Sequence, residues 1–195
     1  LEKFMHSNDD VLTLVKAALI HAQFETIHPF LDGNGRTGRM LITFYLWKEG
    51  YLDKPVLFLS SYFKKHQKIY YERLFGYHLG SVSDWVDFFL DGVIEIAGEA
   101  IDIVGKITAL REKDMLKIHT LGKRSSESAS LVLPRLYEQP IVNVATIQKW
   151  TGFSRVGSQS VINRFIEMGI LTPKDKDKKY GQSYIYKKYI DMFAK

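Results

Sequence analysis

A glycine-rich run between two helical patterns is the feature that most constrains the fold of this chain. Before this run, residues 28–39, apolar positions recur at helical spacing from Val11 to Ala22, with helix-cap candidates at Ser7 to Asp9. After it, a second helical pattern extends from Met40 to Trp47 and stops at Gly50. The sequence therefore predicts a buried helix, a tight loop and a second helix.

The same periodicity continues beyond Gly50. A third helix is expected after Ser60 or Ser61 and should carry Tyr70 and Leu74. A long apolar pattern then runs from Trp85 towards Lys117, although its internal glycines could break it. We therefore expect a mainly α fold with a helical bundle at its core.

The residues from Thr120 onward have a different pattern of predicted helices and strands. The stretch Thr120 to Ser130 is rich in serine and poor in large apolar residues, which favours a domain boundary. Three helical segments should follow, at Leu131 to Tyr137, Val144 to Trp150 and Ser154 to Met168. Two strands, Ile170 to Thr172 and Tyr184 to Tyr186, should flank the loop Lys174 to Gly181. This order is typical of a winged helix, so we predict domains at residues 1–119 and 120–195.

Charge divides the chain at the same place. Residues 1–118 carry 14 Lys+Arg against 16 Asp+Glu, whereas residues 119–195 carry 13 against 6, a net charge of +7. A basic domain of this kind predicts DNA as a partner. Polar residues on the predicted helix after residue 153 point the same way, namely Ser154, Arg155, Ser158, Gln159 and Asn163.

The composition restricts the kinds of site and the cellular location that can be expected for this chain. The chain contains no cysteine, so disulfides and thiolate metal sites are excluded. No apolar run reaches the ~20 residues of a membrane span, and we expect a cytoplasmic protein without a membrane partner. The opening residues Leu1 to Met5 resemble the end of a helix or a linker, which favours a fragment of a longer protein.

The run of residues 28–39 has the composition of a phosphate-transfer site. Glycines allow successive backbone N–H groups to turn towards an anion, and the helix after them adds its positive N-terminal dipole. Arg36 and Arg39 can each offer a planar fork to phosphate oxygens, and Asp32 is suited to hold Mg²⁺. His28 can accept a proton near neutral pH. These residues predict attack by a hydroxyl on a metal-bound nucleotide phosphate.

A dinucleotide-binding fingerprint is the alternative reading of these glycines. Gly33, Gly35 and Gly38 fit Gly-x-Gly-x-x-Gly. That fingerprint requires a preceding strand and a βαβ context, but the residues before it have helical periodicity. We therefore favour the phosphate-transfer reading.

The run resembles the signature of the Fic family, His-Pro-Phe-x-(Asp/Glu)-Gly-Asn-Gly-Arg-x-x-Arg, with every defined position filled. Residues 23–27 and the Tyr70-Tyr71-x-x-Leu74 pattern are also similar, so the resemblance covers roughly residues 1–110. It implies catalytic roles for His28 as the base, Asp32 as the Mg²⁺ ligand, Asn34 and Arg36. It implies ATP contacts for Gly33, Asn34, Gly35, Arg36, Thr37, Gly38, Arg39, Tyr70 and Tyr71, and a core-anchoring role for Phe30.

The resemblance implies a protein adenylyltransferase that moves AMP from ATP to a Ser, Thr or Tyr hydroxyl of a target protein, with ATP and Mg²⁺ as cofactors. A homodimer is one assembly open to such a chain, and the sequence does not name the oligomeric state. Transfer of another phosphate-containing group and a nucleotide-sensing, DNA-binding regulator are the alternatives. Fic proteins also carry a β-hairpin flap and often an inhibitory helix, and neither pattern occurs between Leu1 and His28. A fragment of this kind would hold the catalytic loop without its target clamp or its brake.

Overall fold

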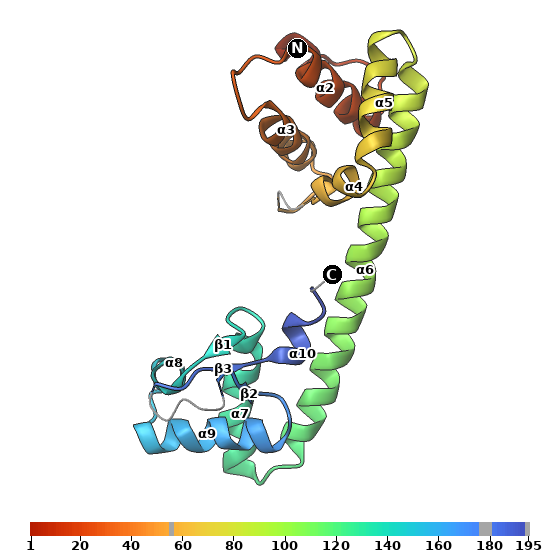
Figure 1. Cartoon of the computed structure of the whole chain (residues 1–195). Coiled ribbons are helices and arrows are strands. Elements are labelled where there is room, and N and C mark those ends of the chain that lie inside the picture. The colour runs from red at the N-terminus through yellow and green to blue at the C-terminus, as the bar shows by residue number, and fades with distance from the viewer. Residues whose placement is uncertain (55–56, 176–180, 194–195) are drawn as a thin grey trace. The chain divides into compact units, whose positions relative to one another are not determined.

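The computed structural model describes residues 1–54, 57–175 and 181–193, and it is mainly helical (Figure 1). Its helices are α1 (Glu2–Met5), α2 (Thr13–Ile27), α3 (Asn34–Lys48), α4 (Leu59–Lys65), α5 (Gln67–His78), α6 (Val82–His119), α7 (Lys123–Leu136), α8 (Val144–Thr151), α9 (Arg155–Glu167) and α10 (Lys187–Ile190). Its strands are β1 (Ile141–Val142), β2 (Thr172–Pro173) and β3 (Tyr184–Ile185). The predicted mainly α class is confirmed. Among the helices of these described ranges, none combines the length and apolarity that crossing a membrane requires.

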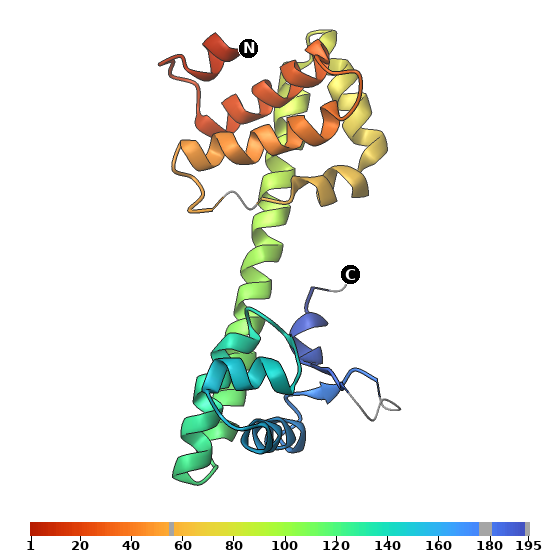
Figure 2. The ribbon, with the colours of Figure 1, turned by 90° about the vertical axis from the view of Figure 1, so that its left-hand side faces the viewer.

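The chain divides into two compact units, Leu1–Ala100 and Ile101–Lys195, with the division inside α6. In the first unit α2 and α3 lie side by side, and α5 packs against both α2 and α4 (Figures 1 and 2). Trp85 of α6 is fully buried, and its indole Nε1–H donates a 2.9 Å hydrogen bond to the carbonyl oxygen of Ala18. This bond and the aromatic packing around Trp85 fix α2, which ends at the glycine-rich loop.

Two details of the first unit differ from the sequence prediction, and a third answers a question that the sequence left open. The residues Ser7 to Asp9 do not cap α2, because the Lys16 ammonium binds the Ser7 carbonyl at 2.7 Å and the Asp9 carboxylate at 3.1 Å. The helix expected after Ser60 is two helices, α4 and α5, which meet at His66. The long pattern after Trp85 is one unbroken helix, because its glycines keep helical geometry in α6.

The second unit combines helices α7, α8 and α9 with a small antiparallel sheet of strand order β1-β3-β2. Its core includes Leu110 and Ile118 from the last part of α6. Asp114 of α6 is fully buried and accepts hydrogen bonds from the Lys117 ammonium at 2.6 Å and the Tyr186 hydroxyl at 2.7 Å. These paired polar groups join α6 to the strand end at Tyr186.

The described part of the second unit also departs from expectation. The serine-rich stretch after Thr120 is mostly helical, because α7 begins at Lys123. Its Ser128 and Ala129 are buried, so small residues face the core there. Strand β1 was not predicted, since two residues carry too little periodicity. Most of the predicted loop after Lys174, residues 176–180, lies outside the described residues.

Candidate active site

His28 lies at the point where α2 ends and the glycine-rich loop begins. It has left-handed backbone angles, φ 48° and ψ 56°, and it is the C-cap of α2. Its side chain is exposed, and Nδ1 lies 3.4 Å from the carbonyl oxygen of Glu25. Because a carbonyl oxygen only accepts, this long contact favours a proton on Nδ1 and leaves the lone pair on Nε2. Nε2 is therefore the atom that can take a proton from a substrate.

The loop ends at the N-terminus of α3, which presents unpaired backbone N–H groups. Gly33 caps the helix with φ 84°, a conformation that favours glycine, and no side chain caps α3. The first N–H groups of a helix have no partner within the helix, so those of Asn34 to Arg36 are available to an anion. The first turn contains no acidic residue that would compete for them.

Asn34 holds the loop in shape. Only 2% of Asn34 is exposed, and its Oδ1 accepts a 2.9 Å hydrogen bond from the Phe30 N–H. Its Nδ2 donates to the Phe30 carbonyl oxygen at 2.6 Å. Phe30 itself is 51% exposed, so the prediction that its ring anchors the loop in the core was wrong. The loop is instead fixed by the Asn34 amide, which forms hydrogen bonds with both the N–H and the carbonyl oxygen of Phe30.

Two guanidinium groups lie over the loop glycines. Arg36 Nη2 is 3.4 Å from the position that a Cβ on Gly33 would occupy, and Arg39 Nη1 is 3.0 Å from the corresponding position on Gly35. The glycines therefore leave room for the arginines to approach the backbone. Arg36 is exposed and Arg39 is half-buried, so both forks are accessible beside the helix N-terminus. This arrangement suits several oxygens of a polyphosphate.

Asp32 is the carboxylate of the loop. Its Oδ1 accepts a 2.7 Å hydrogen bond from the Gly33 N–H, while its Oδ2 lies 3.8 Å from Arg36 Nη2. No cluster of three or more His, Asp or Glu side chains suited to a metal occurs among the described residues. Mg²⁺ commonly binds one protein carboxylate and completes its shell with phosphate and water oxygens. A single exposed carboxylate beside an anion cradle fits that mode.

A buried polar cluster lies behind the loop. His21 is fully buried, stacks on Phe63 and Trp85, and contacts the Tyr70 hydroxyl through Nε2 at 3.1 Å. Burial lowers the pKa of His21 to about 4, so the ring is neutral. Burial also raises the pKa of the Glu25 carboxyl, opposed by the charges of Arg39 and His28.

The same cluster meets α3 at Gly38, one of the predicted ATP contacts. A Cβ added there would lie 2.8 Å from Glu25 Oε1 and 3.1 Å from His21 Nδ1. Gly38 is buried and allows α2 and α3 to approach, so it packs between helices rather than lining the cradle. Thr37 likewise bonds within the helix, since its hydroxyl donates to the Gly33 carbonyl oxygen at 3.1 Å.

The two tyrosines predicted to approach adenine differ from each other. Tyr70 is 5% exposed and packs among aromatic rings of the core, so its predicted contact with the base was wrong. Tyr71 is 58% exposed and meets the Tyr70 ring edge-on at 5.2 Å between centroids. Sequence reasoning missed the partnership of His21 with Tyr70, because 49 residues separate them. The spacing of His21, Glu25 and His28 on one face of α2 was the available signal.

A groove of about 430 Å³ begins at the two arginines and follows α3. Its lining combines guanidinium groups with exposed apolar side chains, namely Arg36, Arg39, Met40, Thr43, Phe44, Leu57, Phe58 and Ser60. Charged forks at one end and apolar walls beyond them are typical of a site for a phosphate-containing organic ligand.

Part of the chain is similar to known proteins. Residues 1–46 match the sequence profile of the Fic/DOC family. The chain is 39% identical over 75 residues to the protein adenylyltransferase Fic of Aedes aegypti, covering 38% of this chain and 14% of that protein. It is 47% identical over 47 residues to a probable protein adenylyltransferase of Aquifex aeolicus, covering 24% of this chain and 15% of that protein.

The matched segment is thus about one-seventh of the length of these curated relatives. A crystal structure of a Fic family protein from Desulfovibrio desulfuricans G20 aligns with 95% of this chain and 52% of that chain, at 21% identity and a TM-score of 0.48. The profile match, residues 1–46, includes α2, the loop and most of α3. The chain thus contains a segment that matches the Fic/DOC family.

Proposed function

We propose that the protein containing this chain is a protein adenylyltransferase, which transfers AMP from ATP to a hydroxyl of a target protein. The observation that carries the proposal is that one short loop connects the exposed His28, at the end of α2, with the uncapped N-terminus of α3. The names of the curated relatives support the same reaction. A base and an anion cradle side by side are the minimum that hydroxyl attack on a phosphate requires.

The proposed reaction assigns a task to each side chain. The target hydroxyl oxygen attacks the α-phosphorus of ATP while His28 Nε2 takes the hydroxyl proton. The bond from the α-phosphorus to its bridging oxygen breaks, and pyrophosphate leaves. The α3 N–H groups stabilise charge on the α-phosphate oxygens, and Arg36 and Arg39 bind the departing phosphates. Mg²⁺ held by Asp32 would neutralise part of the phosphate charge.

His28→Ala in the longer protein tests the base. General-base catalysis contributes about 10²- to 10⁴-fold, so labelling of target from α-labelled ATP should fall by that factor. Binding of ATP should persist, because the cradle and arginines remain. Undiminished labelling by the variant would refute the mechanism. Chelation of Mg²⁺ should also suppress labelling, and Asp32→Asn should raise the Mg²⁺ concentration that restores it.

The mass added to the target separates AMP transfer from the related reactions. Phosphoryl or phosphocholine transfer would use the same loop with the donor placed differently. Mass spectrometry of a labelled target should show the addition of one AMP. Any other added group would replace AMP in the proposal while leaving the roles of His28 and the cradle intact.

We also propose that residues 120–195 form a winged-helix domain and that residues 1–119 form the Fic core. The order of α8, a turn at Gly152, α9 and the antiparallel pair β2–β3 supports this organisation. Leu110 and Ile118 of α6 pack into the second core. A piece that begins at Thr120 should therefore unfold at lower urea concentration than one that begins at Ile101.

A further inference from the structure

The exposed side of α9 is surrounded by three hollows whose linings contain no carboxylate. Their volumes are about 320, 350 and 390 Å³, and α9 contributes to each. The linings, all from described residues, supply the guanidinium groups of Arg124, Arg155 and Arg164 together with several hydroxyls and amides. A surface that offers hydrogen-bond donors and positive charge but no carboxylate is complementary to a polyanion.

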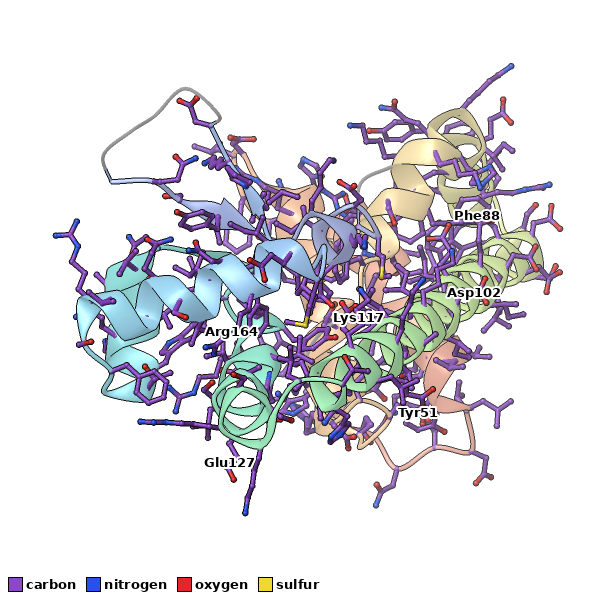
Figure 3. The ribbon with its side chains drawn as sticks, turned by 90° about the horizontal axis from the view of Figure 1, so that it is seen from below. Tyr51, Phe88, Asp102, Lys117, Glu127 and Arg164 are labelled. Atoms are coloured by element: carbon purple, nitrogen blue, oxygen red, sulfur yellow. The ribbon has the colours of Figure 1, made fainter. Side chains whose placement is uncertain are left out.

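The first hollow lies between α7 and α9. Arg124 of α7 and Arg164 of α9 line it together with the hydroxyls of Ser125, Ser154 and Ser160. Glu127 is the acidic residue nearest to Arg124 in α7, but it does not line the hollow, and Figure 3 shows it pointing away from α9. Two guanidinium groups with hydroxyls between them form a site for a phosphate.

The outer face of α9 carries side chains of the types that can bind base edges. Arg155, Gln159 and Asn163 are spaced four apart and share one face. Gln159 Nε2 donates to Asn163 Oδ1 at 2.9 Å, so the Gln159 oxygen and the Asn163 amide hydrogens remain for a ligand. Val156 is 79% exposed on the same face and can contact a thymine methyl. Ser158, predicted as a DNA contact, is fully buried and cannot take part.

We infer that α9 binds duplex DNA, with its N-terminal half in the major groove and a backbone phosphate in the hollow between Arg124 and Arg164. A helix about 10–12 Å across fits a major groove about 12 Å wide. Glu167, the last residue of α9, repels phosphate beyond Arg164, so the DNA lies on the Arg155 side of Arg164. RNA duplexes are excluded by their deep and narrow major groove.

A docked protein fits the face less well. The cores of protein interfaces are enriched in aromatic residues, whereas Val156 is the one large exposed apolar side chain on α9. The surface instead offers charge and hydrogen-bonding groups. This inference is independent of the proposed transfer reaction, because it uses no residue of the first unit.

Fluorescence anisotropy of the chain with labelled, random-sequence duplex DNA across a salt series tests the inference. The affinity should fall as salt rises, and Arg155→Gln and Arg164→Gln should each weaken binding roughly five- to tenfold and lower the salt slope by about 1. Arg111→Gln, the same change on α6 outside the hollows, should leave affinity unchanged. His28→Ala should also bind normally, which separates this inference from the enzyme proposal.

Several results would overturn the inference: no retention of duplex at low salt, equal binding by Arg111→Gln and the two α9 variants, or tighter binding to duplex RNA. Circular dichroism of each variant checks that α9 still folds. Arg155 is exposed at the first helical position, so Arg155→Gln keeps the test decisive even if Arg164→Gln proves unstable.

Discussion

Gly38→Ala tests whether the cradle is held in place by close contact between α2 and α3. In a helix interior this change alone gains about 1 kcal/mol, because alanine has the higher helix propensity. Here the new Cβ would lie 2.8 Å from Glu25 Oε1 and 3.1 Å from both His21 Nδ1 and the Phe24 ring, and the two rings are buried. Overpacking of this kind costs about 1–3 kcal/mol. We expect a net loss of up to about 2 kcal/mol in the free energy of unfolding of the first unit.

Gly98→Ala is the matched control in the same unit. Gly98 is helical in α6, and a Cβ there would have no neighbour within 4 Å. The variant should gain about 1 kcal/mol, so the two alanine variants should differ by about 1–3 kcal/mol. Urea unfolding followed by tryptophan fluorescence measures this difference, since Trp85 reports on the core. Equal stability of the two variants would refute the packing role of Gly38.

Three further variants probe the site. The free energy of unfolding of His28→Gly should exceed that of His28→Ala by about 1 kcal/mol, because only glycine adopts the left-handed angles of residue 28 without strain. Both variants lack the proposed base, and urea unfolding compares their stability. His21 has its pKa lowered to about 4, so its contribution to stability is complete above pH ~6.5 and is lost, by up to about 1.4 kcal/mol per pH unit, as the pH falls towards 4. The raised pKa of Glu25 has the opposite effect, because it adds stability as the pH falls. Urea midpoints measured from pH 7 to 5 should therefore depend on pH, and His21→Gln should remove the part of this dependence that comes from His21. Gly35→Ala should leave the fold intact but displace the flexible Arg39 guanidinium, which calorimetry should detect as weaker ATP binding.

The sequence was informative where a pattern is local. The two helices around the loop and the stop at Gly50 follow from spacing and glycine conformation, although α3 begins at Asn34, inside the run that was predicted as a loop. Contacts between distant residues were not predictable. Tyr70 resembled a ligand contact in sequence, but its hydroxyl meets His21 in the core. The break at His66 was also missed, because the apolar spacing continues through it.

Asn34 and Gly38 explain why a short loop can hold a base and a phosphate cradle in register. His28 belongs to the end of α2 and the cradle belongs to the start of α3, so their separation depends on how closely the two helices pack. Gly38 permits that packing from one side, and the two hydrogen bonds of Asn34 fix the loop backbone from the other. Both residues lie within residues 28–39, and in this structure they stabilise the loop and the helix packing. In the proposed mechanism, a change at either residue should therefore reduce catalysis by moving His28 relative to the α3 N-terminus, although neither residue takes the proton of the hydroxyl.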